Sequence, residues 1–242
     1  MDINKLKPIY KTDFLDLHHA DCMEIMKQYP DKHFDLAIVD PPYGINISQT
    51  FGGEKRKSGK GAALKSAFTK KDWDSAIPNK SYFDELFRVS KNQIIWGANY
   101  FTEYLPNSMG WLAWNKNNGT TKFSDCELAF TSYDKALRMF TYTWNGMLQQ
   151  NMKTKEKRTH PTQKPTDLYD WLINNYSEPN QKLLDTHFGS GSIALAVDRA
   201  NRLDNMNLHL TACEIDLDYV NASIKRISQA IKQQTFHFEK SE

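Results

Sequence analysis

The sequence contains little cysteine, almost no net charge and no long apolar run. Its three cysteines, Cys22, Cys126 and Cys213, are widely spaced and odd in number, which argues against a disulfide framework and a metal site. Their apolar neighbours predict buried thiols in a reducing compartment. No apolar run reaches the roughly 18 residues of a membrane span, and residues 1–7 lack the apolar core of a signal peptide. We therefore expect a cytoplasmic protein with no membrane partner and no metal.

The net charge of +2 over 242 residues argues neither for nor against nucleic acid, so the distribution of basic residues matters more. Residues 44–80 combine glycines with lysines and predict a basic loop insertion, and residues 149–165 form a second basic loop. Such loops can hold phosphates without reading sequence, although a solvated lysine-rich loop is the alternative. The residues expected to contact phosphates are Lys55, Arg56, Lys57, Lys60, Lys153, Lys155 and Arg158.

Short apolar runs alternate with amphipathic segments along most of the chain. This alternation predicts an α/β fold, with a mostly parallel sheet between two layers of helices in a doubly wound arrangement. A hydrophobic content of 40% is sufficient for the core of one substantial domain. The predicted strands cover residues 34–39, 93–97, 110–114, 126–131, 182–185 and 208–213, and the predicted helices cover residues 22–29, 81–90, 166–176, 191–201 and 217–233.

The most informative segment is Asp40-Pro41-Pro42-Tyr43, which follows the apolar run 34–39. Proline has no N–H, so the prolines end the strand and present Asp40 and Tyr43 at its carboxyl end, where open α/β sheets bind ligands. The carboxylate of Asp40 and the carbonyl of Pro41 can accept both N–H bonds of an exocyclic amine, and Tyr43 can stack on a base taken out of the helix. The alternative is a proline-terminated strand followed by a surface turn.

A second candidate site lies near the other end of the chain. An apolar run ends at Asp185, a Gly189-x-Gly191 turn follows, and Glu214 ends a later strand. Glycine lets the backbone approach a ligand closely, and the spacing to Ala194 also fits the dinucleotide fingerprint. Taken alone, these residues suit NAD in a nicotinamide-dependent oxidoreductase as well as another adenosine cofactor. A tight strand-to-helix turn is a further alternative.

Three motifs then occur in order: Asp40-Pro41-Pro42-Tyr43, His160-Pro161-Thr162-Gln163-Lys164-Pro165, and Asp185 with Gly189-Ser190-Gly191-Ser192. Together they resemble the amino-group DNA methyltransferases over about residues 13 to 230. The catalytic motif precedes the cofactor motif, which resembles the circularly permuted order of the beta class. The resemblance implies one methyltransferase domain over residues 1–242 and S-adenosylmethionine as cofactor. It also implies a bacterial or phage-encoded, site-specific enzyme of restriction–modification type that flips a base out of double-stranded DNA; many members form homodimers.

The resemblance also implies roles for individual residues. Asp185, Gly189, Ser190 and Gly191 would surround the methionine portion of the cofactor, Glu214 would hold its ribose, Asp21 would lie near its adenine, and Thr162, Gln163 and Lys164 would close over it. Asp21 can also cap a helix. The family usually has Pro and Phe where this chain has Thr186 and His187, so we expect weaker or pH-sensitive cofactor binding. The catalytic residues would be Asp40, Pro41, Pro42 and Tyr43.

In the family, aspartate at the first motif position favours adenine N6 over cytosine N4 as the methyl acceptor. The target-recognition region is expected between residues 132 and 158, with an ordinary packing segment as the alternative. RNA or protein glutamine as substrate, and a binding protein that has lost catalysis, are further alternatives. The candidate base-contacting residues are Tyr133, Arg138, Tyr142, Trp144, Asn145 and Gln149, and the aromatic residues expected in the core are Trp96, Tyr100, Phe101, Trp111 and Trp114.

Overall fold

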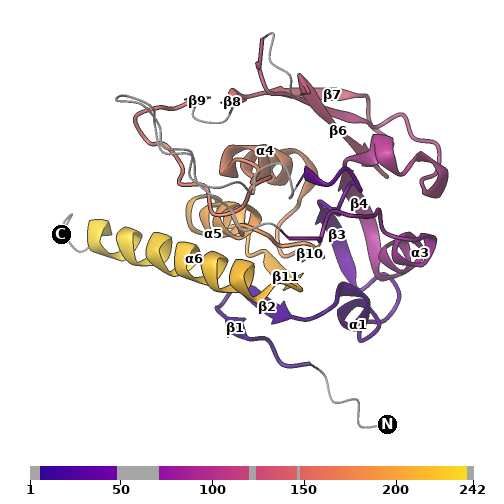
Figure 1. Ribbon diagram of the computed structural model, residues 1–242. Coiled ribbons are helices and arrows are strands. Elements are labelled where there is room, and N and C mark those ends of the chain that lie inside the picture. Colours follow the sequence, from indigo (N-terminus) through magenta and orange to yellow (C-terminus); the bar gives the residue numbers. More distant parts are fainter. Residues whose placement is uncertain (1–5, 48–70, 120–123, 146–147, 239–242) are drawn as a thin grey trace.

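The computed structural model describes residues 6–47, 71–119, 124–145 and 148–238 (Figure 1). Most of the predicted basic insertion, including Lys55, Arg56, Lys57 and Lys60, lies outside these residues. Within the described residues, no helix is both long and apolar enough to cross a membrane.

The described strands form a nine-stranded sheet in the order β1-β2-β11-β10-β3-β4-β6-β5-β7. Strands β2, β11, β10, β3 and β4 are mutually parallel, whereas β6 runs antiparallel to both of its neighbours. A separate pair, β8 (Trp144–Asn145) and β9 (Leu148–Gln149), is antiparallel. The strands of the large sheet are β1 (Tyr10–Lys11), β2 (Leu15–His19), β3 (Phe34–Val39), β4 (Ser90–Trp96), β5 (Leu112–Asn115), β6 (Cys126–Thr131), β7 (Arg138–Thr141), β10 (Lys182–Asp185) and β11 (His209–Glu214).

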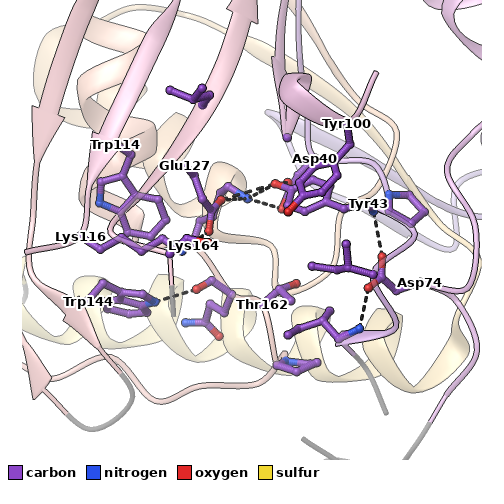
Figure 2. A pocket seen from close by; sticks show the side chains of 18 of the residues that line it. Asp40, Tyr43, Asp74, Tyr100, Trp114, Lys116, Glu127, Trp144, Thr162 and Lys164 are labelled. Atoms are coloured by element: carbon purple, nitrogen blue, oxygen red, sulfur yellow. Dashed lines mark hydrogen bonds and ion pairs between the residues drawn. The ribbon is translucent and has the colours of Figure 1, made fainter. Parts of the chain in front are cut away.

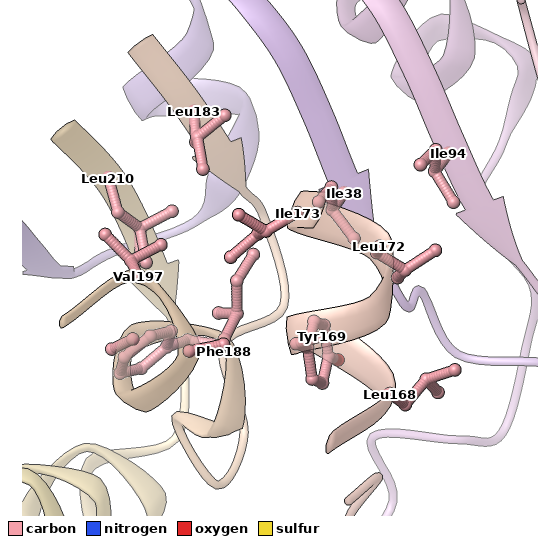
Figure 3. Packing of buried hydrophobic residues seen from close by; sticks show 14 of the residues in the cluster. Ile38, Ile94, Leu168, Tyr169, Leu172, Ile173, Leu183, Phe188, Val197 and Leu210 are labelled. Carbon is pink, nitrogen blue, oxygen red and sulfur yellow. The ribbon is translucent and has the colours of Figure 1, made fainter. Parts of the chain in front are cut away.

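Helices cover both faces of this sheet. Successive residues of a strand point to opposite faces, so a strand with apolar residues at both kinds of position needs a covering layer on each side. In β3, Leu36 and Ile38 join one hydrophobic cluster, which Figure 3 shows packed against α4 and α5, while Ala37 and Val39 join the cluster under α1 and α3. The three-layer α/β prediction is therefore confirmed. The helices are α1 (Cys22–Met26), α3 (Lys80–Val89), α4 (Thr166–Tyr176), α5 (Ser192–Asp204) and α6 (Leu217–Phe238), with short 3-10 turns η1 (Ala98–Tyr100) and η2 (Thr102–Tyr104).

The predicted strands and helices are all present, with boundaries shifted by a few residues. Five short strands, β1, β2, β7, β8 and β9, were not predicted, because they are too short or too polar to show a clear alternation. The prediction of buried thiols is confirmed for Cys213, whereas Cys22 is half-buried and Cys126 is exposed, so for Cys126 it was wrong. Cys126 begins β6 between the charged residues Asp125 and Glu127, so its immediate sequence neighbours are not apolar.

The two candidate sites meet where the winding of the sheet reverses. From β10 the chain continues through α5 to β11 on one side, and from β3 it continues through α3 to β4 on the other. Strands β10 and β3 are parallel neighbours, with Leu184 opposite Ala37. Asp185 and Asp40 therefore lie at the carboxyl ends of adjacent strands. This is the crevice in which open α/β sheets bind ligands.

Candidate active site

Asp40 belongs to a cluster of charged side chains at this crevice (Figure 2). Lys164 Nζ lies 2.5 Å from Asp40 Oδ2 and 3.0 Å from Glu127 Oε2. Tyr43 donates its hydroxyl to Asp40 Oδ1 at 2.5 Å, and Lys164 donates to the same hydroxyl at 3.2 Å. Lys116 pairs with the other oxygen of Glu127. Two carboxylates and two ammonium groups thus balance each other, which lets the protein bury them together.

The cluster divides its protons unequally. Burial raises the pKa of Asp40 against the opposing charge of Lys164, and the neighbouring charge of Glu127 raises it further. Burial also acts to raise the pKa of Glu127, but Lys164 and Lys116 outweigh it and lower that pKa to about 2. The two carboxylates hold the pKa of Lys164 above its usual value despite burial. Glu127 is therefore the carboxylate that favours the ionised form, whereas the pKa of Asp40 is raised and depends on the charges around it.

The Tyr43 ring is held in a narrow aromatic slot. It stacks on Tyr100 with ring centroids 5.1 Å apart and planes 15° from parallel. Gly97, at φ +70°, passes so close beneath the ring that an added Cβ would lie 2.1 Å from it. Only glycine suits this position. Tyr100 was predicted to be a core residue, and this was wrong: its side chain is 40% exposed, whereas Trp96 and Phe101 are buried as predicted.

A cavity of about 240 Å³ opens beside these groups. Its walls are aromatic and amide-rich, with Trp144 on one side and Tyr43 and Asp40 on the other (Figure 2), and Asn145 also lines it. Arg158 also lines it and places its guanidinium 5.1 Å from the centre of the Trp144 ring. A flat, polar-edged molecule such as a nucleobase suits such walls, since they offer stacking faces and hydrogen-bonding partners.

The glycine turn after β10 forms the second half of the crevice. Gly189 and Gly191 have φ angles of +51° and +72°, which favour glycine. Glu214 Oε2 accepts the Gly189 N–H at 2.8 Å and so holds the turn against the end of β11. Asp185 Oδ1 accepts the backbone N–H of His187 at 3.0 Å. The close backbone and the two carboxyls suit a ligand that carries positive charge and hydroxyls.

Asp185 and Glu214 form no ion pair with another described residue. Burial raises the pKa of Asp185 to about 8, and it also raises the pKa of Glu214. S-adenosylmethionine carries a sulfonium and an ammonium group, and its ribose offers two hydroxyls. The donor and acceptor groups of this turn therefore fit that cofactor, with Asp185 suited to its cationic part and Glu214 to its ribose.

Two other predicted cofactor residues occupy the surroundings of this turn. Asp21 caps α1, accepting the Met23 N–H at 2.7 Å, as its position before the helix predicted. His187 is half-buried overall and donates or accepts toward Thr186 at 2.9 Å, and its ring packs edge-on against Tyr82. Burial of the imidazole lowers the pKa of His187 to about 4. The ring is therefore neutral near pH 7 and can serve as the wall that the family builds from Phe.

The segment His160–Pro165 joins the two halves of the crevice. Lys164 directs its ammonium to Asp40, while its carbonyl accepts the Ser192 hydroxyl at 2.8 Å. The resemblance implied that this residue closes over the cofactor; in the structure its ammonium pairs with Asp40 and Glu127. Thr162 and Gln163 line the cavity, and the Gln163 carbonyl accepts the Trp144 indole N–H at 2.8 Å. Next to the glycine turn, the His160 ring would lie 3.7 Å from a Cβ on Gly189.

The predicted recognition region divides into packing and cavity residues. Tyr133 and Tyr142 pack on the core. The Tyr133 hydroxyl donates to the Tyr176 carbonyl, and the Tyr142 hydroxyl donates to Asp167. Gln149 is buried, and its side-chain amide bonds the backbone of Glu156. Trp144 and Asn145 line the cavity, and Arg138 lies exposed on β7. Lys153 and Lys155 are exposed, and Arg158 is half-buried.

Sequence reasoning missed several residues of the site. Glu127, Lys116, Tyr100 and Asp74 all line the cavity, yet none belongs to a motif with a diagnostic spacing. The usable signal was a charged residue inside a predicted strand: Glu127 interrupts the apolar run of β6, opposite Trp114 of β5.

Comparison with known proteins identifies the family. A family model for N6/N4 methyltransferases, described as DNA methylase, matches residues 92–225. The chain belongs to this family of amino-group DNA methyltransferases.

Two curated relatives of this DNA methylase are named type II methyltransferases. M1.MboII of Moraxella bovis is 21% identical, with 85% of this chain and 93% of the relative aligned. M.HinfI of Haemophilus influenzae is 25% identical, with 90% and 70% aligned.

Solved structures share its architecture. The M1.HpyAVI–SAM complex has a TM-score of 0.51 at 18% identity, covering 88% of this chain and 98% of that one. The PvuII cytosine-N4-specific methyltransferase has a TM-score of 0.57 at 14% identity, covering 90% and 88%. At these identities the likeness shows the fold, which is that of methyltransferases.

Proposed function

We propose that this DNA methylase transfers a methyl group from S-adenosylmethionine to the exocyclic N6 of adenine within a specific sequence of double-stranded DNA. The observation that carries the proposal is the meeting of Asp40 with the glycine turn at adjacent strand ends. Lys164 links the two directly, because its side chain bonds Asp40 and its carbonyl bonds Ser192.

The residues of the acceptor side supply positioning and electrostatics. The Asp40 carboxylate and the Pro41 carbonyl accept the two N–H groups of the amine and so direct its lone pair toward the methyl donor. Tyr43 now donates to Asp40 Oδ1, so the incoming amine replaces this hydroxyl and the Tyr43 ring becomes a stacking face. The bound cofactor supplies an electrophilic methyl group on sulfur. The methylated amine then loses one proton, which the Asp40 carboxylate can accept.

Basic residues of one segment support a nucleic-acid substrate. Arg158 lines the cavity, and Lys153 and Lys155 of the same segment are exposed. Lysine and arginine side chains can contact the phosphates that flank an extruded base. Such residues favour DNA or RNA over a protein substrate, and the family favours DNA.

Cytosine N4 is the second candidate acceptor. Its amine presents the same two N–H groups to Asp40, and the fold is shared with a cytosine-N4-specific enzyme. The preference for adenine comes from the aspartate at position 40.

The test is to incubate the protein with S-adenosylmethionine and unmodified DNA, digest the product to nucleosides and identify the methylated one by mass spectrometry. We expect N6-methyladenine, and modification-sensitive sequencing then gives its flanking motif. N4-methylcytosine would establish the second candidate, and no methylation of any DNA would refute both. Asp40→Ala should abolish turnover while leaving the cofactor dissociation constant within a few fold, which calorimetry measures. Near-normal methylation by this variant would exclude Asp40 from the reaction.

A further inference from the structure

A buried carboxylate outside every predicted motif holds the backbone of the catalytic segment. Asp74 is 1% exposed. Its Oδ1 accepts the backbone N–H of Tyr43 at 2.8 Å and that of Gly44 at 3.0 Å, and its Oδ2 accepts the N–H of Ile47 at 2.8 Å. Figure 2 shows Asp74 below Tyr43, with dashed lines to two of these backbone groups. One side chain thus satisfies three main-chain donors.

The turn that it holds has an irregular backbone. Gly44 has a φ of +71° and Asn46 a φ of +55°, so two residues of five adopt the left-handed region. Asn46 also donates its N–H to the Asp74 carbonyl at 2.9 Å. Successive N–H groups that converge in such a turn form a small anion-binding concavity. Here the anion belongs to the protein itself.

The position of the Tyr43 ring depends on this turn. Its N–H is fixed by Asp74, while its hydroxyl reaches Asp40 and its ring stacks on Tyr100. A shift of the backbone at Tyr43 would carry the ring with it, because Gly97 leaves no slack beneath the ring. The side chain of Asp74 also lines the same cavity.

We propose that Asp74 is a positioning residue for the methyl acceptor, which fixes the Tyr43–Ile47 turn and thereby the face on which the extruded base stacks. This inference rests on the proposed function. Asp74 does not need to touch the base or the cofactor, since it acts through the backbone of Tyr43. Loss of the carboxylate should therefore impair the use of DNA and leave cofactor binding intact.

The test compares two variants of graded severity. Asp74→Asn keeps one oxygen for the N–H groups of Tyr43 and Gly44 but turns an NH₂ group toward the N–H of Ile47, so one bond is lost. Asp74→Ala loses all three. Asp84→Asn is the matched control, because that carboxylate is 61% exposed on α3 and pairs with Lys80.

We expect Asp74→Ala to lower kcat/KM for DNA at least tenfold, Asp74→Asn to lie between it and wild type, and the control to match wild type. The cofactor dissociation constant should stay within twofold in all of them. Hydrogen exchange read by mass spectrometry supplies a readout independent of activity. Exchange in peptides covering residues 40–47 should accelerate in the order Asn, then Ala, while peptides covering strand β3 (Phe34–Val39) stay protected.

Unchanged kinetics in Asp74→Ala, with or without faster exchange in the turn, would overturn the proposal. Equal loss of protection in β3 would also overturn it, because Asp74 would then act on the whole fold. If wild type methylates no DNA, the proposed function fails, and the exchange measurement still decides whether Asp74 holds the turn.

Discussion

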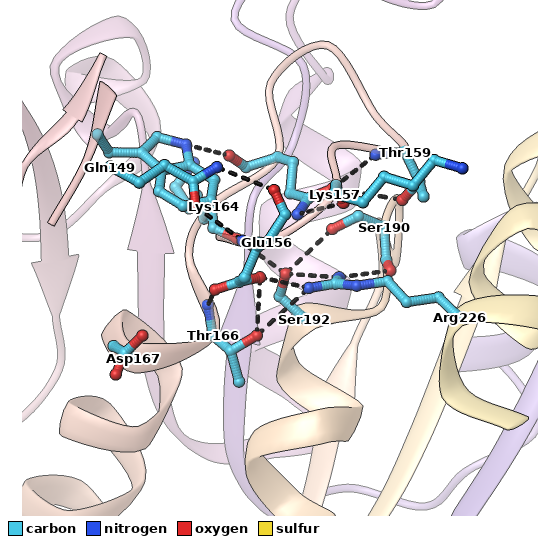
Figure 4. Close-up of polar contacts among 12 residues, drawn as sticks. Gln149, Glu156, Lys157, Thr159, Lys164, Thr166, Asp167, Ser190, Ser192 and Arg226 are labelled. Atoms are coloured by element: carbon cyan, nitrogen blue, oxygen red, sulfur yellow. Dashed lines mark hydrogen bonds and ion pairs between the residues drawn. The ribbon is translucent and has the colours of Figure 1, made fainter. Parts of the chain in front are cut away.

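Arg226 of α6 forms an ion pair with Glu156 and also contacts the glycine turn, and its removal has a predictable cost (Figure 4). The side chains are only 12% and 20% exposed, and Arg226 Nη2 lies 2.5 Å from Glu156 Oε2. Arg226 also donates to the Ser190 carbonyl and the Ser192 hydroxyl, both at 2.9 Å. Arg226→Met keeps the length of the side chain and removes every one of these bonds.

The structure sets the size of the effect. Breaking a buried ion pair by removing one partner costs about 3 to 5 kcal/mol, because the other charge is left without compensation. In Arg226→Met, Glu156 still accepts hydrogen bonds from the backbone N–H and the hydroxyl of Thr166. We therefore expect the variant to lose about 3 kcal/mol of unfolding free energy, at the lower end of this range. Because the urea dependence of unfolding is typically about 1 to 3 kcal/mol per molar, the midpoint should fall by at least about 1 M.

Cofactor binding should suffer as well, since the lost bonds hold the glycine turn. Cofactor at about 100 times its dissociation constant stabilises the folded state by about 2.7 kcal/mol, and a tenfold weaker site would reduce this gain to about 1.4 kcal/mol. Urea unfolding of wild type and Arg226→Met, each with and without S-adenosylmethionine, measures both quantities. Lys80→Met is the control, because Lys80 and its partner Asp84 are 70% and 61% exposed. We expect this variant to change the free energy of unfolding by less than about 0.5 kcal/mol.

A double-mutant cycle with Glu156→Gln then isolates the pair. We expect a coupling free energy of about 1 to 3 kcal/mol between the two positions. Additivity within about 0.5 kcal/mol would refute the reasoning, since it would show that the two side chains stabilise the fold independently.

Three further predictions concern protons. The pKa of His187 falls from 6.5 to about 4 on folding, so its contribution to stability is full above pH 6.5 and is lost as the pH falls toward 4. Between pH 7.5 and 5, the free energy of unfolding of His187→Phe should therefore fall by about 2 kcal/mol less than that of wild type, as measured by urea titration. Because Asp185 has a pKa of about 8, a cationic cofactor should displace its proton, so calorimetry in buffers of different ionisation enthalpy should show one proton released at pH 7, and none with Asp185→Asn. Glu127→Gln removes a negative charge that raises the pKa of Asp40, so the acid limb of the pH–rate profile should move to lower pH. Lys116→Met leaves Glu127 with Lys164 as its ion-pair partner, which weakens the hold of Lys164 on Asp40, so the acid limb should move to higher pH. Movement in the same direction in both variants would contradict the sharing of Lys164 between Asp40 and Glu127.

The two motifs that could be predicted from the sequence are local. Asp40-Pro41-Pro42-Tyr43 follows an apolar run, and the Gly189–Gly191 turn follows another, so proline and glycine mark the strand ends without any knowledge of the fold. Parallel strands then bring such ends to one edge of a sheet. The placement of both motifs at one edge of the sheet could therefore be anticipated, whereas the adjacency of β3 and β10 is shown by the strand order.

The rest of the site depends on register between distant segments. Glu127 reaches Lys164 because β6 pairs with β4 and β5, and no local spacing encodes that pairing. Asp74 likewise finds its partners 27 to 31 residues away. A buried charged residue and a solvated one look alike in a sequence. The exposure of Cys126, by contrast, is signalled by its charged neighbours Asp125 and Glu127.

The distribution of these charges explains how one crevice can hold two unlike ligands. On the acceptor side, Asp40 and Glu127 are matched by Lys164 and Lys116, which leaves a pocket of no net charge for a neutral base. On the cofactor side, the carboxyls at positions 185 and 214 have no cationic partner among the described residues, which leaves that pocket ready for a positive ligand. A cation at the glycine turn would meet the carboxyls of Asp185 and Glu214, whereas a cation beside Asp40 would also face the ammonium groups of Lys164 and Lys116. This difference in charge supports the proposed assignment of a cationic methyl donor to the glycine turn and a neutral methyl acceptor to the Asp40 side.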